Sequence, residues 1–150
     1  MPTKQEFKDL KSSCYWVWTS DYSGKAGYIV YKNKGSEAGS AVYQKGTPNS
    51  SYSTASDPHI FLPAVGYITD SKTYDAGVIG TYWSSSLFTD YDNILYTPFA
   101  SCHLHFYYAS ITTENSGFRC DGEAVRAVRR LNQFEESYDG NFESEKETKL

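Results

Sequence analysis

The sequence predicts an α+β domain built from one short helix, twisted antiparallel strands and long loops, and three observations support this prediction. Aromatic residues make up 17% of the 150 residues, with 14 tyrosines, whereas a helical bundle needs leucine-rich heptads. A capping box marks one helix near the start of the chain. Several later segments alternate apolar and polar residues with a period of two, which is typical of half-buried strands.

The predicted helix begins after Thr3, whose hydroxyl can cap the amide of Glu6 while the Glu6 carboxylate reaches back to the backbone of Thr3. Phe7 and Leu10 then give the helix one apolar stripe, and we expect it to end near Lys11. The stripe is narrow, so the helix is expected to pack on the rest of the domain through one side.

The first two strands are predicted to form a hairpin. Residues 14–19 alternate, with Tyr15 and Val17 on one side of the strand. The other side carries Cys14, Trp16 and Trp18. Residues 27–31 provide the partner strand, across a turn at 21–25.

The middle of the chain is expected to be mostly loop. Residues 33–58 are rich in Gly, Ser, Asn and Pro, which indicates a long surface excursion with one short strand at 41–43. Residues 60–67 form the most apolar run, but Pro63 excludes this run from the middle of a continuous ladder. Residues 71–80 are predicted to be a loop.

The later strands are predicted at 81–85, 102–107, 110–113 and 125–129. Within 102–107 the alternation places Cys102, Leu104 and Phe106 on one face and His103, His105 and Tyr107 on the other. The tryptophan that follows Tyr82, Trp83, is interpreted as a core anchor. The domain is expected to span residues 1–130, and residues 131–150 form an acidic tail that is mobile or becomes ordered only on a partner.

Charge excludes two classes of partner. Residues 131–150 hold six acidic and two basic side chains, which accounts for the whole formal net charge of −4. The remaining body is neutral and lacks the basic field that nucleic acid or an anionic membrane surface requires. No apolar run is long enough to insert into a membrane. We therefore expect no nucleic-acid partner and no membrane insertion.

The first residues carry no apolar run, so no signal peptide is predicted. The chain has three cysteines, Cys14, Cys102 and Cys120. An odd number favours three reduced thiols and synthesis in the cytoplasm, but one disulfide with one free thiol is the alternative. Two destinations fit this pattern. The chain is either assembled into a virion or is a domain excised from an exported protein.

No constellation in the sequence predicts catalysis. His103 and His105 could present two imidazoles to a metal, but Cys102 points to the opposite face and no second ligand pair completes the geometry. A nucleophilic Cys102 or Cys120 would need a base held by a third group, and no such group is indicated. The sequence therefore predicts a protein that is not an enzyme and that holds no metal and no cofactor.

Four blocks of sequence carry a resemblance to a known family. They are an opening block at 2–7 and 14–19, Phe-Leu-Pro-Ala-Val-Gly-Tyr at 61–67, Gly-Thr-Tyr-Trp-Ser-Ser at 80–85 and Gly-Glu-Ala-Val-Arg-Ala-Val at 122–128. In this order they resemble the Fibrobacter succinogenes major paralogous domain family of gut Bacteroidetes and their phages. The resemblance spans residues 2–130, but alanines replace the serine and proline of the family's closing block.

The resemblance implies a C-type lectin-like fold, which is shared with formylglycine-generating enzymes and with the variable proteins of diversity-generating retroelements. In those variable proteins, tyrosine-rich positions before the closing block bind the ligand. The cysteine pair of formylglycine-generating enzymes is not matched here, and the Glu-Pro-Asn, Gln-Pro-Asp and Trp-Asn-Asp strings of calcium-dependent lectins do not occur.

The region between residues 82 and 108 is rich in tyrosine and serine and holds no lysine, a composition that recognition surfaces use. Its candidate ligand-binding residues are Tyr91, Tyr96, His103, His105, Tyr107 and Tyr108, which we expect to be exposed. The predicted function is a recognition or adhesion module that binds a glycan or a protein, on a phage particle or a cell surface. The alternative is an assembly subunit that uses the aromatic face as an obligate interface, as a homo-oligomer or with a virion partner.

Overall fold

The computed structural model describes residues 1–89 and 97–128. Within these ranges it confirms the α+β class, with one short α-helix and mainly antiparallel sheets. Of the predicted features, Tyr91, Tyr96 and the acidic tail at 131–150 lie outside the described residues. No helix in the described ranges has the length and apolar character needed to cross a membrane.

The capping box forms as predicted at the start of α1 (Lys4–Ser13). The backbone amide of Glu6 donates to the Thr3 hydroxyl over 3.1 Å, and the Thr3 amide donates to the Glu6 carboxylate over 2.6 Å. Phe7 is the buried residue of the helix. Because the apolar stripe is narrow, α1 packs through one side, across β1, β7 and β8.

The first sheet has the strand order β3-β1-β2-β4. Its strands are β1 (Cys14–Tyr22), β2 (Lys25–Lys32), β3 (Ala41–Val42) and β4 (His59–Pro63). The predicted hairpin joins β1 to β2 through Ser23 and Gly24, both at positive φ, as a tight two-residue turn requires. Pro63 ends β4, an edge strand, where a missing amide hydrogen is tolerated.

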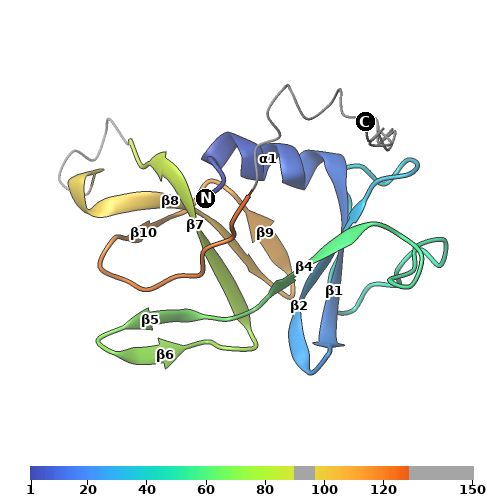
Figure 1. Ribbon diagram of the computed structural model, residues 1–150. Helices are drawn as coiled ribbons and strands as arrows, with labels where there is room; N and C mark the ends of the chain where they lie inside the picture. Colours follow the sequence, from blue (N-terminus) through green and yellow to red (C-terminus); the bar gives the residue numbers. More distant parts are fainter. Residues whose placement is uncertain (90–96, 129–150) are drawn as a thin grey trace, which may run out of the picture.

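The second sheet runs β10-β8-β7, with β9 also paired to β8. Its strands are β7 (Ile79–Leu87), β8 (Ala100–Tyr107), β9 (Ser110–Thr112) and β10 (Ser116–Phe118), and a 3-10 turn (Thr97–Phe99) precedes β8. A separate hairpin, β5 (Tyr67–Thr69) with β6 (Lys72–Tyr74), extends beside this sheet (Figure 1). In the same view α1 lies over the region where the two sheets approach each other.

The main core lies between α1 and the two sheets. It comprises Phe7, Trp16, Tyr28, Val30, Leu62, Ala64, Tyr82, Leu104, Phe106 and Ile111. Its closest approach is at Gly80, where an added Cβ would lie 2.1 Å from the Phe106 ring. Only glycine at this position lets the β7 backbone lie against that ring.

A second cluster lies on the other side of the first sheet and explains how a long excursion is held in place. Tyr15 and Val17 pack there with Ile29 and Tyr31, as the alternation predicts. Tyr52, from the 33–58 excursion, covers this cluster, with its ring centroid 4.6 Å from that of Tyr15. The excursion is mostly exposed, and the Tyr52 ring fixes it to the sheet by covering this cluster.

Two strand predictions fail. Residues 72–74 were predicted to be loop but pair with β5, because Asp70 and Ser71 both take positive φ and form a two-residue turn without the Asn-Gly signal. Residues 125–128 were predicted to be strand, but they are exposed and irregular. The isolated bridge from Ala124 to Tyr82 ends before residue 125, and none of residues 125–128 belongs to a strand or bridge.

Candidate functional site

The alternation predicted for strand β8 is confirmed. Cys102, Leu104 and Phe106 face the core and are at most 2% exposed. On the opposite, outer face, the rings of His103, His105 and Tyr107 lie one beside the next along the strand. The ring centroids of His103 and His105 lie 5.9 Å apart, and those of His105 and Tyr107 lie 6.3 Å apart.

Further rings extend this row at both ends. Tyr108 continues it at 5.5 Å from Tyr107. Trp83 of β7 lies 5.9 Å from His103, and Trp18 of β1 lies 6.5 Å from Tyr108. We call this set the ring row, and its members are Trp83, His103, His105, Tyr107, Tyr108 and Trp18. It crosses from the second sheet to the first, which no local sequence pattern indicates.

The predicted exposure of His103 is wrong. Its side chain is only 7% exposed, and its Nδ1 atom lies 2.8 Å from Oε1 of Glu123, whose side chain is 4% exposed. The reason is tertiary: β10 pairs with β8, and the segment after β10 folds back over the outer face. Strand alternation identifies the face but not what covers it.

His105 is half-buried on the same face. Burial, and to a lesser extent the neighbouring His103, lowers the pKa of His105 below its ordinary value. The imidazole of His105 is therefore held toward its neutral form, which can both donate and accept a hydrogen bond.

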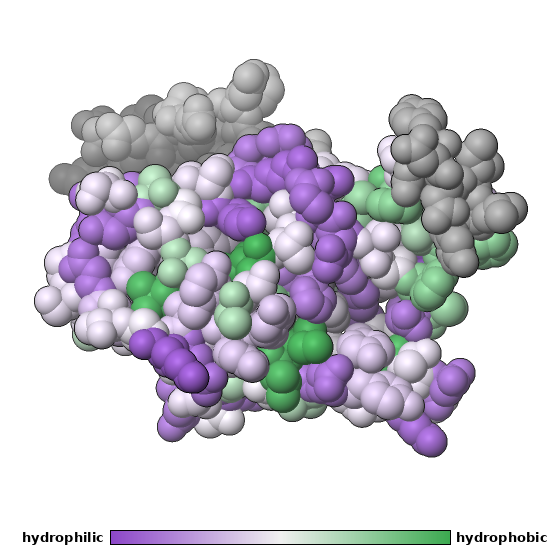
Figure 2. Space-filling view, turned by 180° about the vertical axis from the view of Figure 1, so that it is seen from behind, coloured by the Kyte–Doolittle hydropathy of each residue, from purple (hydrophilic) through white to green (hydrophobic). Residues whose placement is uncertain are grey.

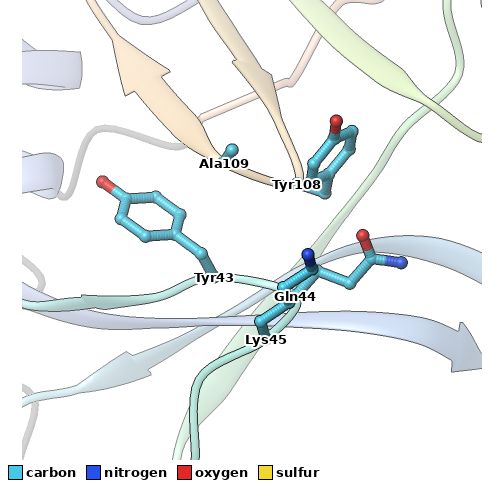
Figure 3. Close-up of a pocket in the computed structure, with 5 residues that line it drawn as sticks. All are labelled: Tyr43, Gln44, Lys45, Tyr108 and Ala109. Carbon is cyan, nitrogen blue, oxygen red and sulfur yellow. The ribbon is translucent and has the colours of Figure 1, made fainter.

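A groove lies at the other end of the ring row, between the segment after β3 and the turn that joins β8 to β9. Figure 3 shows the Tyr43 and Tyr108 rings on opposite sides of this pocket, which has a volume of about 330 Å³. Gln44, Lys45 and Ala109 complete its lining, and we call these five residues the tyrosine groove. Tyr43 and Tyr108 are 42% and 43% exposed.

The groove is held together by the backbone. The amide of Gln44 donates to the Tyr108 carbonyl over 3.0 Å, which links the two walls. Sequence reasoning identified Tyr108 but missed Tyr43, Gln44 and Lys45, because the 33–58 excursion was interpreted as surface loop with one short strand at 41–43 and not as part of a site. The available signal was a tyrosine at the end of that short strand.

The predicted role of Trp83 as a core anchor is also wrong. Trp83 is half-buried on the outer face, whereas the adjacent Tyr82 is 4% exposed and donates its hydroxyl to the Pro63 carbonyl over 2.8 Å. Burial raises the pKa of Tyr82 to about 12. The Tyr-Trp pair therefore places its tyrosine in the core and its tryptophan in the ring row.

The cysteines are all unpaired. Cys102 lies in the core, where burial raises the pKa of its thiol and its Sγ atom is 3.4 Å from the Leu87 carbonyl oxygen. A raised thiol pKa disfavours the nucleophilic thiolate. Among the described residues, no group of three or more His, Cys, Asp and Glu side chains could hold a metal ion.

Comparison with known proteins gives no relative. No family model matches the chain, and neither curated proteins nor solved structures match it.

Proposed function

We propose that this chain is a non-catalytic recognition domain of the C-type lectin-like fold, related to the Fibrobacter succinogenes major paralogous domains. It binds a glycan or a protein segment in the tyrosine groove, on a phage particle or a cell surface. Two segments far apart in the sequence that meet on β7 support the proposed fold. The amide of Ser85 donates to the Pro2 carbonyl over 2.8 Å, and that of Trp83 donates to the Ala124 carbonyl over 3.0 Å.

One observation carries the proposal: two half-exposed tyrosine rings face each other across a pocket at the end of a row of stacked rings. Tyrosine offers a large apolar face with few rotatable bonds, so little conformational entropy is lost when it binds. The rings can stack on the C–H face of a sugar or on an apolar side chain, because the lining of the groove is almost entirely apolar. Stacking of this kind needs no metal.

A second candidate function is an assembly subunit, and exposed apolar side chains favour it. Leu87 is 64% exposed, Phe99 is 65% exposed and Val125 is 60% exposed. An obligate interface, however, is a large and continuous apolar surface. On the face in Figure 2, outside the grey atoms, hydrophobic residues form separate patches among hydrophilic ones. This face therefore does not present the large continuous apolar surface of an obligate interface.

Binding of the wild-type domain to arrayed glycans and to arrayed surface proteins tests the proposed function. We expect Tyr108→Ala and Tyr43→Ala each to weaken binding by at least about tenfold, because each removes one wall of the groove. Tyr74→Ala is the matched control, since Tyr74 is 39% exposed and lies in the β5–β6 hairpin. Equal binding by Tyr108→Ala and the wild type would contradict a role for the groove.

Light scattering after size-exclusion chromatography separates the two candidate functions. A recognition domain is expected to elute as a monomer at micromolar concentration. A stable oligomer that persists on dilution, together with no binding to either array, would favour the assembly subunit instead.

A further inference from the structure

A second pocket, of about 290 Å³, lies at the end of the ring row opposite the tyrosine groove. His103, Asp121 and Glu123 contribute its charged or ionisable groups, with His105 beside them, and Tyr67 and Phe118 contribute apolar rings. We call it the His–Glu pocket. It combines a few polar groups with apolar walls, which is the usual composition of a small-ligand site.

The His–Glu pocket holds two buried polar atoms without a hydrogen-bond partner. They are Nε2 of His103 and Oε2 of Glu123, on side chains that are 7% and 4% exposed. Buried polar atoms are almost always paired, so two unpaired atoms on adjoining side chains need an explanation. A ligand that donates hydrogen bonds to both would provide one.

With His103 as a neutral imidazole, both unpaired atoms are acceptors. Nδ1 of His103 lies 2.8 Å from a Glu123 oxygen and therefore carries the proton that it donates to the carboxylate. In the neutral ring Nε2 then holds a lone pair, and Oε2 of the carboxylate holds others. Neither of these two atoms can donate, so a ligand that satisfies both must bring the donors.

The charges in the lining also favour a ligand that donates hydrogen bonds and carries a positive charge. Asp121 and Glu123 are acidic, and the described lining includes no lysine and no arginine. A carboxylate or phosphate ligand would meet these acids with its own negative charge, whereas a cation would be attracted to them.

We propose that the His–Glu pocket binds a protonated primary amine, either a free alkylammonium or the side chain of a lysine. An ammonium group carries three N–H donors and no acceptor, so it can satisfy Nε2 of His103 and Oε2 of Glu123 and leave one donor for Asp121. The small pocket volume suits a single alkyl chain. This inference does not depend on ligand binding in the tyrosine groove.

Gly117 supports a pocket built around the His103–Glu123 pair. A Cβ added at Gly117 would lie 2.5 Å from Oε1 of Glu123 and 3.1 Å from Nδ1 of His103. The backbone of β10 therefore lies close over the hydrogen bond, and an alanine at this position would require the Glu123 carboxylate to shift.

Titration of the full chain with n-butylammonium chloride, followed through the imidazole ¹⁵N resonances of His103, tests the proposal. We expect a saturable shift with a Kd on the order of 1 mM, as befits a ligand of a few atoms. Butyrate and n-butanol are the matched probes of the same chain length. Butyrate should cause no shift, and n-butanol should bind at least about tenfold more weakly.

Glu123→Gln should weaken butylammonium binding by at least about tenfold, because it removes the buried negative charge but keeps the side-chain shape. Glu114→Gln is the control, since Glu114 is exposed and pairs with Lys4 and Lys8 away from the pocket. If Glu123→Gln does not fold, Asp121→Asn serves as the second variant, with a smaller loss of affinity expected.

Two further probes separate the sources of the amine. A short peptide with one central lysine and blocked ends, if it binds more tightly than butylammonium, identifies a lysyl side chain as the ligand. Weaker binding of the peptide identifies a free amine, and Nε-acetylation of the lysine should abolish peptide binding. The proposal is overturned if His103 shows no saturable shift with either amine, or if butyrate shifts it equally.

Discussion

The two faces of strand β8 have the same backbone and the same length but opposite chemistry. The inner face, with Leu104 and Phe106, is 0% exposed and packs with α1 and both sheets. The outer face, with His105 and Tyr107, holds half-buried rings that lie beside one another in a row. A strand can therefore hold a domain together with one face and present a binding surface with the other.

The contrast also shows how a binding surface is kept in place. Each β8 ring of the ring row is attached to a backbone whose other side is packed in the core, and Trp18 at its end packs on Tyr28. We expect substitutions on the inner face to unfold the domain and substitutions on the outer face to alter binding or pH response.

The largest effect is expected from Phe106→Ala. The Phe106 ring is fully buried, packs edge-on against Tyr28 at 5.3 Å and lies directly against Gly80. Its removal leaves a cavity that β7 cannot fill, so the free energy of unfolding should fall by about 3–5 kcal/mol. Urea denaturation followed by tryptophan fluorescence measures this. A loss below about 1 kcal/mol would show that the inner face is not the structural one.

Gly117→Ala is expected to have the next largest effect. The added methyl group would displace the Glu123 carboxylate from His103, and the free energy of unfolding should fall by about 1–3 kcal/mol. Gly35→Ala is the control, because Gly35 is exposed and an added Cβ would meet only the end of the Glu37 side chain. Equal stability of the two variants would argue against a tightly covered His103–Glu123 pair.

Tyr107→Ala should cost about 1 kcal/mol or less, because it removes a half-buried ring and its edge contacts to neighbouring rings but leaves the core filled. The hydrogen bond from the Tyr28 hydroxyl to residue 107 is made to the backbone carbonyl and survives the substitution. The same denaturation experiment compares this variant with Phe106→Ala. A similar decrease in the free energy of unfolding for the two variants would contradict the proposed difference between the two faces of β8.

The smallest effect concerns pH. Burial and the neighbouring His103 lower the pKa of His105 in the native state below 6.5, so the unfolded chain binds a proton more readily than the native protein does. This histidine therefore destabilises the fold as pH falls through its unfolded pKa toward its lower native pKa. His105→Gln should flatten the decline in the free energy of unfolding between about pH 7 and pH 5. An unchanged slope would contradict this assignment.

Much of the fold could be predicted from local signals. The capping box gave the start of the helix, and strict alternation gave the two sides of β1 and β8. The β5–β6 hairpin could not be predicted, because its turn uses Asp70 and Ser71 at positive φ without a glycine. Of the candidate site, Tyr107 and Tyr108 were predicted and lie in the ring row, whereas Tyr43 and Glu123 were not predicted.

By itself, the sequence determined which residues share a face, because the period of a strand or a helix is a property of the local backbone. It also determined the helix cap and the first hairpin turn, which depend on residues next to each other in the chain. Only the tertiary structure decided that His103 is buried against Glu123 and that Tyr43 faces Tyr108. Those contacts join segments far apart in the sequence, so their existence depends on how the sheets and loops pack and not on any local period.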